Sequence, residues 1–280
     1  INMLSYKSGR GKTTVQRAAM SIWAKPTLLF SFEATTWNAL LTNIGTMHSL
    51  PVFVDEFTNA QPQDISSFVY QVSTGEGKRR LNQAGELRTN ASGWETLVGC
   101  SANRSMVSTV AAGKSNPEAE IARVIEYEFE VVSKMKDLEA AELLRQLHEN
   151  HGMVGDQFAR WLVKPQNQQY ARELVLKLQE HITTRANLSA VHRFWAQGMA
   201  CILAAGLIAK QLEFISFDMK NLTAWTVRKL MTMCSTADEN TMSLTEMFGQ
   251  LLTDMGPNLL VTDNWGDLRT GRAAYVYREP

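Results

Sequence analysis

Near its start, the chain carries a string of residues whose types and spacing suit phosphate binding: Ser8, Gly9, Arg10, Gly11, Lys12, Thr13 and Thr14. In such a loop, backbone N–H groups wrap around an anion, a lysine reaches the β- and γ-phosphates, and a Ser/Thr hydroxyl holds Mg²⁺. A helix expected from Thr13 to Trp23 would add its N-terminal N–H groups. The string therefore predicts a P-loop, although the pattern G-x-x-x-x-G-K-[ST] has Tyr6 where it requires glycine.

Two acids follow the apolar stretch 51–54, at the point where a buried strand is expected to end. Because the carboxyl ends of parallel strands meet at one edge of a sheet, both acids would lie beside the P-loop. We expect Asp55 to hold Mg²⁺ together with Thr13, and Glu56 to orient and polarise the attacking water. An acidic turn without a catalytic role is the alternative interpretation.

Two further polar residues follow in the order that an ATPase of this kind needs. Asn103 comes after a strand expected over 96–101 and would sense the γ-phosphate, unless it only caps a helix. Arg123 precedes the last core strand, in a segment that resembles the arginine-finger segment of AAA+ proteins, in which the arginine of one subunit reaches its neighbour's γ-phosphate. Arg104 is a competing candidate, and an ion pair with a nearby glutamate is the structural alternative for Arg123.

A basic, glycine-bearing segment lies between the acids and Asn103. Its first three cations are Lys78, Arg79 and Arg80. Its position resembles that of the hairpin which often faces the central pore in ring helicases, where cations contact phosphates without reading sequence. A solvated basic loop, or cations that complete the ATP site, are the alternatives.

The composition limits the classes of function. The 280 residues suffice for one or two domains, and the formal net charge of zero gives no global basic field, so any DNA contact must be local. Three widely spaced cysteines predict neither a zinc site nor a disulfide framework, which favours a reducing cytosol. His148 and His151 have no evident third ligand, so they do not predict a metal site. The apolar run 199–209 is too short to span a bilayer and predicts a buried helix. The start at Ile1 suggests an excised piece of a longer protein, and no signal peptide is visible.

Strand-like and helix-like segments alternate over residues 1–130, which predicts an α/β P-loop NTPase core, a largely parallel sheet with helices on both faces. Thr35 or Thr36 would cap a helix that runs to about His48. Residues 131–255 have helical spacing and predict a helical domain, and 256–280 could form a terminal β-hairpin. The strands are expected at 2–5, 27–32, 51–55, 96–101, 124–129, 259–263 and 273–277.

Several of these motifs in combination resemble a phage and plasmid family known as domain of unknown function 927, whose members often sit in primase–helicase proteins. The similarity is carried by residues 8–14, 34–40, 51–56, 69–70 and 75–78, continues through Trp94 and 96–101, and recurs more weakly at 151–158 and 193–209. The resemblance implies a P-loop ATPase of the superfamily 3 or AAA+ kind that uses ATP and Mg²⁺ in mobile-element DNA replication. Tyr6 departs from the family's glycine, and Gly9 could supply the flexibility instead.

The sequence thus predicts an ATP-dependent DNA helicase or translocase module of a phage-like replication protein. It would act on single-stranded DNA as a homo-oligomeric ring, expected to be a hexamer, in the cytoplasm of a bacterial host. A primase or polymerase domain would fit upstream. One alternative is a packaging-type DNA motor ATPase. Another is a replication-loading or scaffold protein that binds nucleotide with little turnover, because Tyr6 blocks hydrolysis.

Overall fold

The computed structural model describes residues 1–76, 93–114, 117–128 and 137–241, together with 248–249, 252, 259–261 and 275–277. The chain divides into two compact units, residues 1–237 and 238–280. The first unit contains a sheet whose strands are β1 (Asn2–Leu4), β2 (Phe30–Ser31), β3 (Val52–Asp55), β4 (Val98–Ala102) and β5 (Glu126–Glu128).

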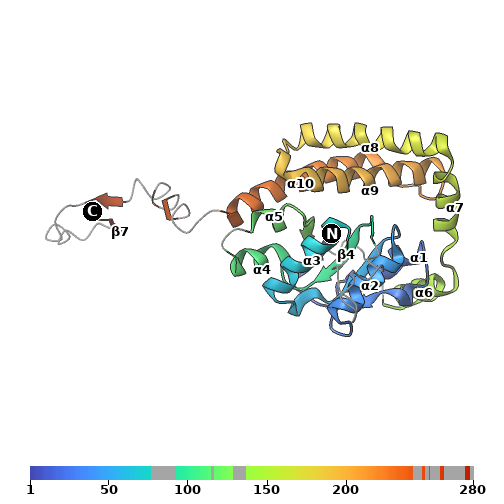
Figure 1. The fold of residues 1–280 in the computed structure, drawn as a ribbon, viewed down its shortest axis with the longest axis horizontal. Coiled ribbons are helices and arrows are strands. Elements are labelled where there is room, and N and C mark those ends of the chain that lie inside the picture. Colours follow the sequence, from blue (N-terminus) through green and yellow to red (C-terminus); the bar gives the residue numbers. More distant parts are fainter. Residues whose placement is uncertain are drawn as a thin grey trace, which may run out of the picture. The chain divides into compact units, whose positions relative to one another are not determined.

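Helices flank this sheet (Figure 1). Those that follow its strands are α1 (Lys12–Ser21), α2 (Trp37–Met47), α3 (Pro62–Thr74), α4 (Met106–Gly113) and α5 (Glu118–Ile121). Those that come after β5 are α6 (Asp137–Glu149), α7 (Met153–Leu162), α8 (Pro165–Arg185), α9 (Arg193–Gln211) and α10 (Met219–Thr241). Short 3₁₀ turns lie at η1 (Pro26–Leu28), η2 (Phe57–Asn59) and η3 (Ala190–His192).

The strand order is β2-β3-β4-β1-β5, and every pairing in this sheet is parallel. In register, Asn2 of β1 lies opposite Cys100 of β4 and Glu126 of β5. The predicted parallel sheet with flanking helices is therefore confirmed, and β4 lies between β1 and β3. This order brings the carboxyl ends of β1, β4 and β3 side by side at one edge.

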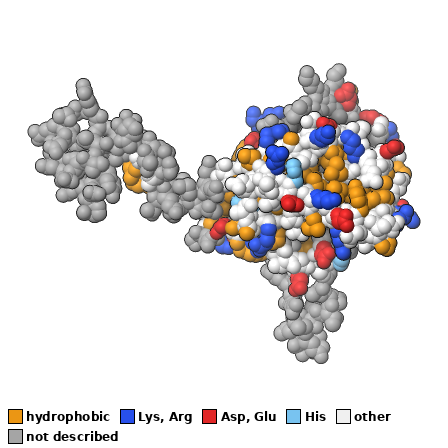
Figure 2. Space-filling model, turned by 90° about the horizontal axis from the view of Figure 1, so that it is seen from above, with side chains coloured by type: hydrophobic (Ala, Val, Ile, Leu, Met, Phe, Trp, Pro, Cys, Tyr) orange, Lys and Arg blue, Asp and Glu red, His pale blue; other side chains and the backbone are white. Residues whose placement is uncertain are grey.

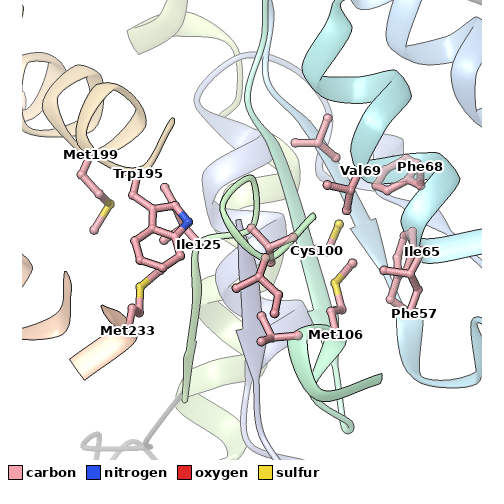
Figure 3. Close-up of a cluster of buried hydrophobic side chains, with 14 of the residues drawn as sticks. Phe57, Ile65, Phe68, Val69, Cys100, Met106, Ile125, Trp195, Met199 and Met233 are labelled. Carbon is pink, nitrogen blue, oxygen red and sulfur yellow. The ribbon is translucent and has the colours of Figure 1, made fainter. Parts of the chain in front are cut away.

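Apolar side chains cover both faces of the sheet (Figure 3). Val52 and Val54 are fully buried on β3, and Phe57, Ile65 and Phe68 pack beyond them. On the other side, Figure 3 shows Trp195, Met199 and Met233 gathered next to Ile125. Because these helical residues belong to the same hydrophobic core as the strands, α9 and α10 help to hold the sheet in place.

Helix α9 is the longest apolar segment of the described chain. The stretch Ala190–Gln211 has the length and composition of a membrane span, with a mean hydropathy of 1.2. Its apolar residues Trp195, Ala200 and Leu203 are, however, buried against the rest of the first unit. We interpret α9 as a core helix, as the run 199–209 predicted.

The C-terminal end of α1 is joined by backbone hydrogen bonds to the N-terminal end of α7. The N–H groups of Gly152 and Gly155 donate to the carbonyl oxygens of Ser21 and Ile22, both at 2.8 Å. These carbonyls belong to the last residue of α1 and to its C-cap, where the helix supplies no partner. A side chain at Gly155 would overlap the Ile22 carbonyl oxygen and the Trp23 ring, so glycine permits this close approach. The helical segment is thereby attached directly to the helix that begins at Lys12.

The structure differs from the sequence-based expectations in three respects. The strand expected at 27–32 is mostly η1, since only Phe30 and Ser31 pair with β3. Helix α4 was not predicted, whereas α10 lies within the stretch 131–255 that was expected to be helical. In the second unit, β6 (Leu259–Val261) and β7 (Tyr275–Tyr277) pair in parallel, whereas a hairpin requires antiparallel strands, so the terminal β-hairpin is not confirmed. The domain boundary near residue 130 remains a prediction.

Candidate nucleotide-binding site

The loop between β1 and α1 takes its shape from two glycines. Gly9 and Gly11 have φ angles of 71° and 84°, in the left-handed region that glycine adopts without a steric penalty. Tyr6 is not among the residues with positive φ, and its side chain is 65% exposed. The position where the P-loop pattern requires glycine therefore accommodates tyrosine in an ordinary backbone conformation.

The loop also presents free hydrogen-bond donors. The N–H groups of residues 6–11 donate to no acceptor among the described residues, and no side chain caps the N-terminus of α1. A Cβ atom added at Gly9 or Gly11 would meet nothing within 4 Å, so the space around both glycines is open. Unpaired N–H groups at a helix N-terminus favour an anion, and this loop fits a phosphate group.

Lys12 connects the loop to the end of β4. Its side chain is buried, and Nζ donates to Asn103 Oδ1 at 2.6 Å and to the Ser5 carbonyl at 3.3 Å. Burial lowers the pKa of Lys12, while the charge of Asp55 acts in the opposite direction. The backbone of Asn103 is fixed in turn, because its N–H donates to Thr58 Oγ1 at 2.9 Å. The lysine and the expected sensor therefore lie in direct contact.

Asp55 is oriented by three donors. Thr13 Oγ1 donates to Oδ2 at 2.7 Å, while Ser101 Oγ and the Glu56 N–H, the latter at 3.1 Å, donate to Oδ1. A threonine hydroxyl beside a carboxylate is an oxygen-ligand pair of the kind that Mg²⁺ prefers. Together with Lys12 and the open N–H groups, this pair fits a magnesium–nucleotide complex.

Glu56 lies next to Asp55 in a left-handed backbone conformation, with φ at 65°. Its carboxylate accepts a hydrogen bond from Ser31 Oγ of β2 at 3.4 Å. Such a conformation is uncommon for a residue other than glycine. Here it turns the chain from the end of β3 into η2. The exposed carboxylate is thus held at the carboxyl edge of the sheet, between β3 and β2.

Two buried polar residues of this region were not predicted from the sequence. Ser101 is buried on β4 and bridges the ends of two strands through Asp55. Gln16, also buried, donates from Nε2 to the Val54 carbonyl at 3.0 Å and so ties α1 to β3. The signal for both was a polar residue on the apolar face of a predicted strand or helix, which is notable only once the neighbouring elements are known.

Arg123 does not join this group. It precedes β5, at the amino ends of the strands, whereas Lys12 and Asp55 lie at the carboxyl ends. Its guanidinium stacks 4.7 Å from the ring centroid of Tyr70 and 5.0 Å from that of Phe194. Among the described residues it forms no ion pair with a glutamate, the alternative suggested by the sequence. Arg104, by contrast, is exposed immediately after Asn103.

Three other predicted residues lie in the loop and at the start of α1. Ser8 and Arg10 are exposed in the loop, and Thr14 is half-buried in the first turn of α1. The cations 78–80 lie outside the described residues. Within the part of the chain that the structure describes, no group of three or more His, Cys, Asp or Glu residues could hold a metal, and His151 Nδ1 lies 3.0 Å from the His148 carbonyl.

Comparison with known proteins gives a family match for part of the chain. Residues 2–92 match the family described as domain of unknown function DUF927. No curated protein sequence matches. A solved structure described as SCCmec type IV Cch, an active helicase, is similar with a TM-score of 0.70 over 99% of this chain, at 16% sequence identity. The chain spans about half, 50%, of that structure's chain. At this identity the likeness establishes the fold alone, an α/β sheet with flanking helices.

Proposed function

We propose that the chain is the ATP-hydrolysing module of a DNA helicase or translocase from a phage-like replication protein. The observation that carries the proposal is the cluster at the carboxyl edge of the sheet. There, two adjacent residues of α1 make separate contacts, Lys12 with Asn103 and Thr13 with Asp55. An acidic turn without a role would not require the two residues that follow a glycine-rich loop to contact the ends of two strands.

Each residue of the cluster has a distinct role in the proposed reaction. When bound, Mg²⁺ would neutralise charge on the β- and γ-phosphates of ATP. Thr13 and Asp55 would hold the metal, and Lys12 would bind the same phosphates. Glu56 would orient the attacking water and accept its proton, and Asn103 would hold the γ-phosphate in place.

The finer part of the proposal concerns assembly. Several copies would form a ring in which an arginine of one copy stabilises the charge on the γ-phosphate bound to its neighbour. Arg123 and Arg104 are the two candidates. To act in this way, Arg123 would have to leave the rings of Tyr70 and Phe194, whereas Arg104 is already exposed. If Arg123 is the finger, Arg123→Ala abolishes hydrolysis in the assembled protein and leaves nucleotide binding intact; if Arg104 is, Arg104→Ala does so instead.

The substrate would be single-stranded DNA, contacted without sequence preference in part by Lys78, Arg79 and Arg80. The similar structure is described as an active helicase, which supports DNA as the partner. We propose a cytoplasmic location in a bacterial host, and a primase or polymerase domain elsewhere in the same protein.

A steady-state ATPase assay with and without single-stranded DNA tests the proposal. Stimulation by DNA is expected, and unwinding of a forked duplex then distinguishes a helicase from a packaging-type motor. No hydrolysis in either condition would favour the scaffold alternative. Since the Tyr6 side chain points into solvent and its backbone is unstrained, we expect Tyr6→Gly to change the turnover only slightly.

A further inference from the structure

A row of alternating cations and aromatic rings lies at the amino ends of the strands, on the opposite edge from the nucleotide site. Its members, which we call the cation–aromatic ladder, are Lys114, Tyr70, Arg123, Phe194 and Arg193. The successive distances from cation to ring centroid are 5.5, 4.7, 5.0 and 5.0 Å. Four separate segments contribute to it: the end of α3, the end of α4, the approach to β5 and the start of α9.

The centre of the ladder is fixed by further contacts. Arg123 Nε donates to Ser73 Oγ at 3.0 Å, and one of its terminal nitrogens donates to the Ala119 carbonyl. The two rings are half-buried. A guanidinium held between two rings keeps its plane in a defined orientation, so the ladder is a preformed surface and not a set of independent side chains.

The charge of the ladder is only partly compensated. Lys114 pairs with the buried Glu120, to which Ser66 Oγ also donates, at 2.5 Å. Arg123 and Arg193 have no carboxylate partner among the described residues. The chain has a net charge of zero, and its surface on the face in Figure 2 carries both signs interspersed, so the charge of these two neighbouring arginines is a local feature. An anionic partner would complete the ladder.

We propose that the cation–aromatic ladder is a contact surface for single-stranded DNA, in which phosphates and a base contact the exposed guanidinium of Arg193, which the Phe194 ring supports from beneath. Single-stranded nucleic acid offers both chemistries that the ladder offers, because its phosphates need cations and its bases stack on aromatic rings and guanidinium planes. A free phosphate or an acidic peptide would use the charge but not the rings.

The position of the ladder agrees with this partner. Ser73, which holds Arg123, lies one turn before Glu76, and Glu76 forms an antiparallel bridge with Gly93. The sequence between these bridged residues contains the basic residues expected from sequence to contact DNA. The inference rests on the proposed function, since it names a surface for the DNA on which the motor would act.

The test measures binding of a fluorescently labelled oligothymidine by anisotropy, on the full chain and without nucleotide. Arg193→Glu is the main variant, because Arg193 is exposed and its replacement leaves the packed centre of the ladder intact. Arg172→Glu is the matched control, an exposed arginine about 20 Å along α8 from the end that joins α9. We expect Arg193→Glu to weaken binding about tenfold, and to lower the slope of log K against log salt concentration by about the amount that one phosphate contact contributes. Arg172→Glu should bind within about twofold of wild type.

A second variant, Phe194→Leu, removes the aromatic face but keeps an apolar side chain; we expect a loss of about fivefold, with the melting temperature recorded alongside. If wild type binds and Arg193→Glu binds equally well, the ladder is not a DNA surface, although the proposed function survives. If Phe194→Leu lowers the melting temperature and leaves DNA affinity unchanged, the ladder only fastens α9 to the sheet. If wild type does not bind oligothymidine at all, both the inference and the proposed function fail.

Discussion

The ammonium group of Lys12 lies 2.6 Å from the side-chain oxygen of Asn103, although 91 positions separate the two residues in the sequence. The contact joins the first residue of α1 to the residue that follows β4. It exists because β4 pairs directly with β1, so that the loop after one strand faces the loop after the other. The group that would bind phosphate and the group that would sense it are therefore set next to each other by strand order alone.

This contact predicts that replacing Lys12 and replacing Asn103 affect different steps, the binding of nucleotide and its hydrolysis. Lys12→Ala should abolish nucleotide binding, since it removes the charge that the phosphates need. Asn103→Ala should leave the Kd for ATP within about threefold, but lower kcat about 100-fold, the usual cost of removing one hydrogen-bond donor to a developing charge. Equilibrium titration and single-turnover hydrolysis measure the two quantities separately. A parallel loss of binding and turnover in Asn103→Ala would show that Asn103 only shapes the loop.

Ser101 should act as a positioning residue through Asp55. Its hydroxyl donates to Asp55 Oδ1, and a hydrogen bond to a charged group contributes about 1.5–3 kcal/mol. We expect Ser101→Ala to raise the Mg²⁺ concentration for half-maximal hydrolysis about tenfold, while nucleotide affinity without metal stays unchanged. Ser21→Ala is the control, since Ser21 is a buried serine whose hydroxyl bonds only within α1, to Ala18. An equal response of the two variants would contradict this role.

The pH dependence of nucleotide binding should report on Lys12. Burial lowers the pKa of Lys12, so in the free protein the ammonium loses its proton at a lower pH than an ordinary lysine. Because only the charged form attracts phosphate, the affinity for ATP should fall as the pH rises toward that lowered pKa. The stability has the opposite sign: the unfolded chain binds the proton more tightly, so unfolding becomes less favourable as the pH rises from the lowered pKa to the ordinary pKa of a lysine. In Lys12→Arg the affinity for ATP should not change with pH over this range, because arginine does not titrate there. If Lys12→Arg and wild type show the same pH dependence, Lys12 is not its source.

Gly155 should be needed for the joint between α1 and α7. In Gly155→Ala the added methyl group would overlap the Ile22 carbonyl, and overpacking of this kind costs about 1–3 kcal/mol. Denaturant unfolding should show this loss. Gly249→Ala is the control, because an added Cβ there would meet nothing within 4 Å. If the two variants had equal free energies of unfolding, the contact between α1 and α7 would accommodate the methyl group without loss of stability.

Much of the sheet and of the cluster around Lys12 was predictable from the sequence because the signals are local. Apolar runs indicated the strands, glycines with Lys12 and Thr13 indicated the loop, and Thr36 was one of two expected caps and does accept a hydrogen bond from the Ala39 N–H, at 3.4 Å. Parallel pairing then requires the ends of the strands to meet at one edge.

The rest depended on partners far away in the sequence. Ser101 became recognisable only when β4 was placed beside β3, and Arg123 only when Tyr70 and Phe194 were seen on either side of it. The bounds of α10 could not be read from the sequence, because its apolar residues are interrupted by threonines. The parallel pairing of β6 and β7 could not follow from two short apolar segments that suit either direction.

The most direct test of the account is the rate of phosphate release from ATP in the presence of Mg²⁺, measured for wild type and for Lys12→Ala under identical conditions. Arg17→Ala, a change on the same helix outside the cluster, controls for altered folding. The account predicts steady release by wild type and Arg17→Ala, and release at the background rate by Lys12→Ala and in the absence of Mg²⁺. Equal release by wild type and Lys12→Ala, or none by wild type with DNA present, would contradict it.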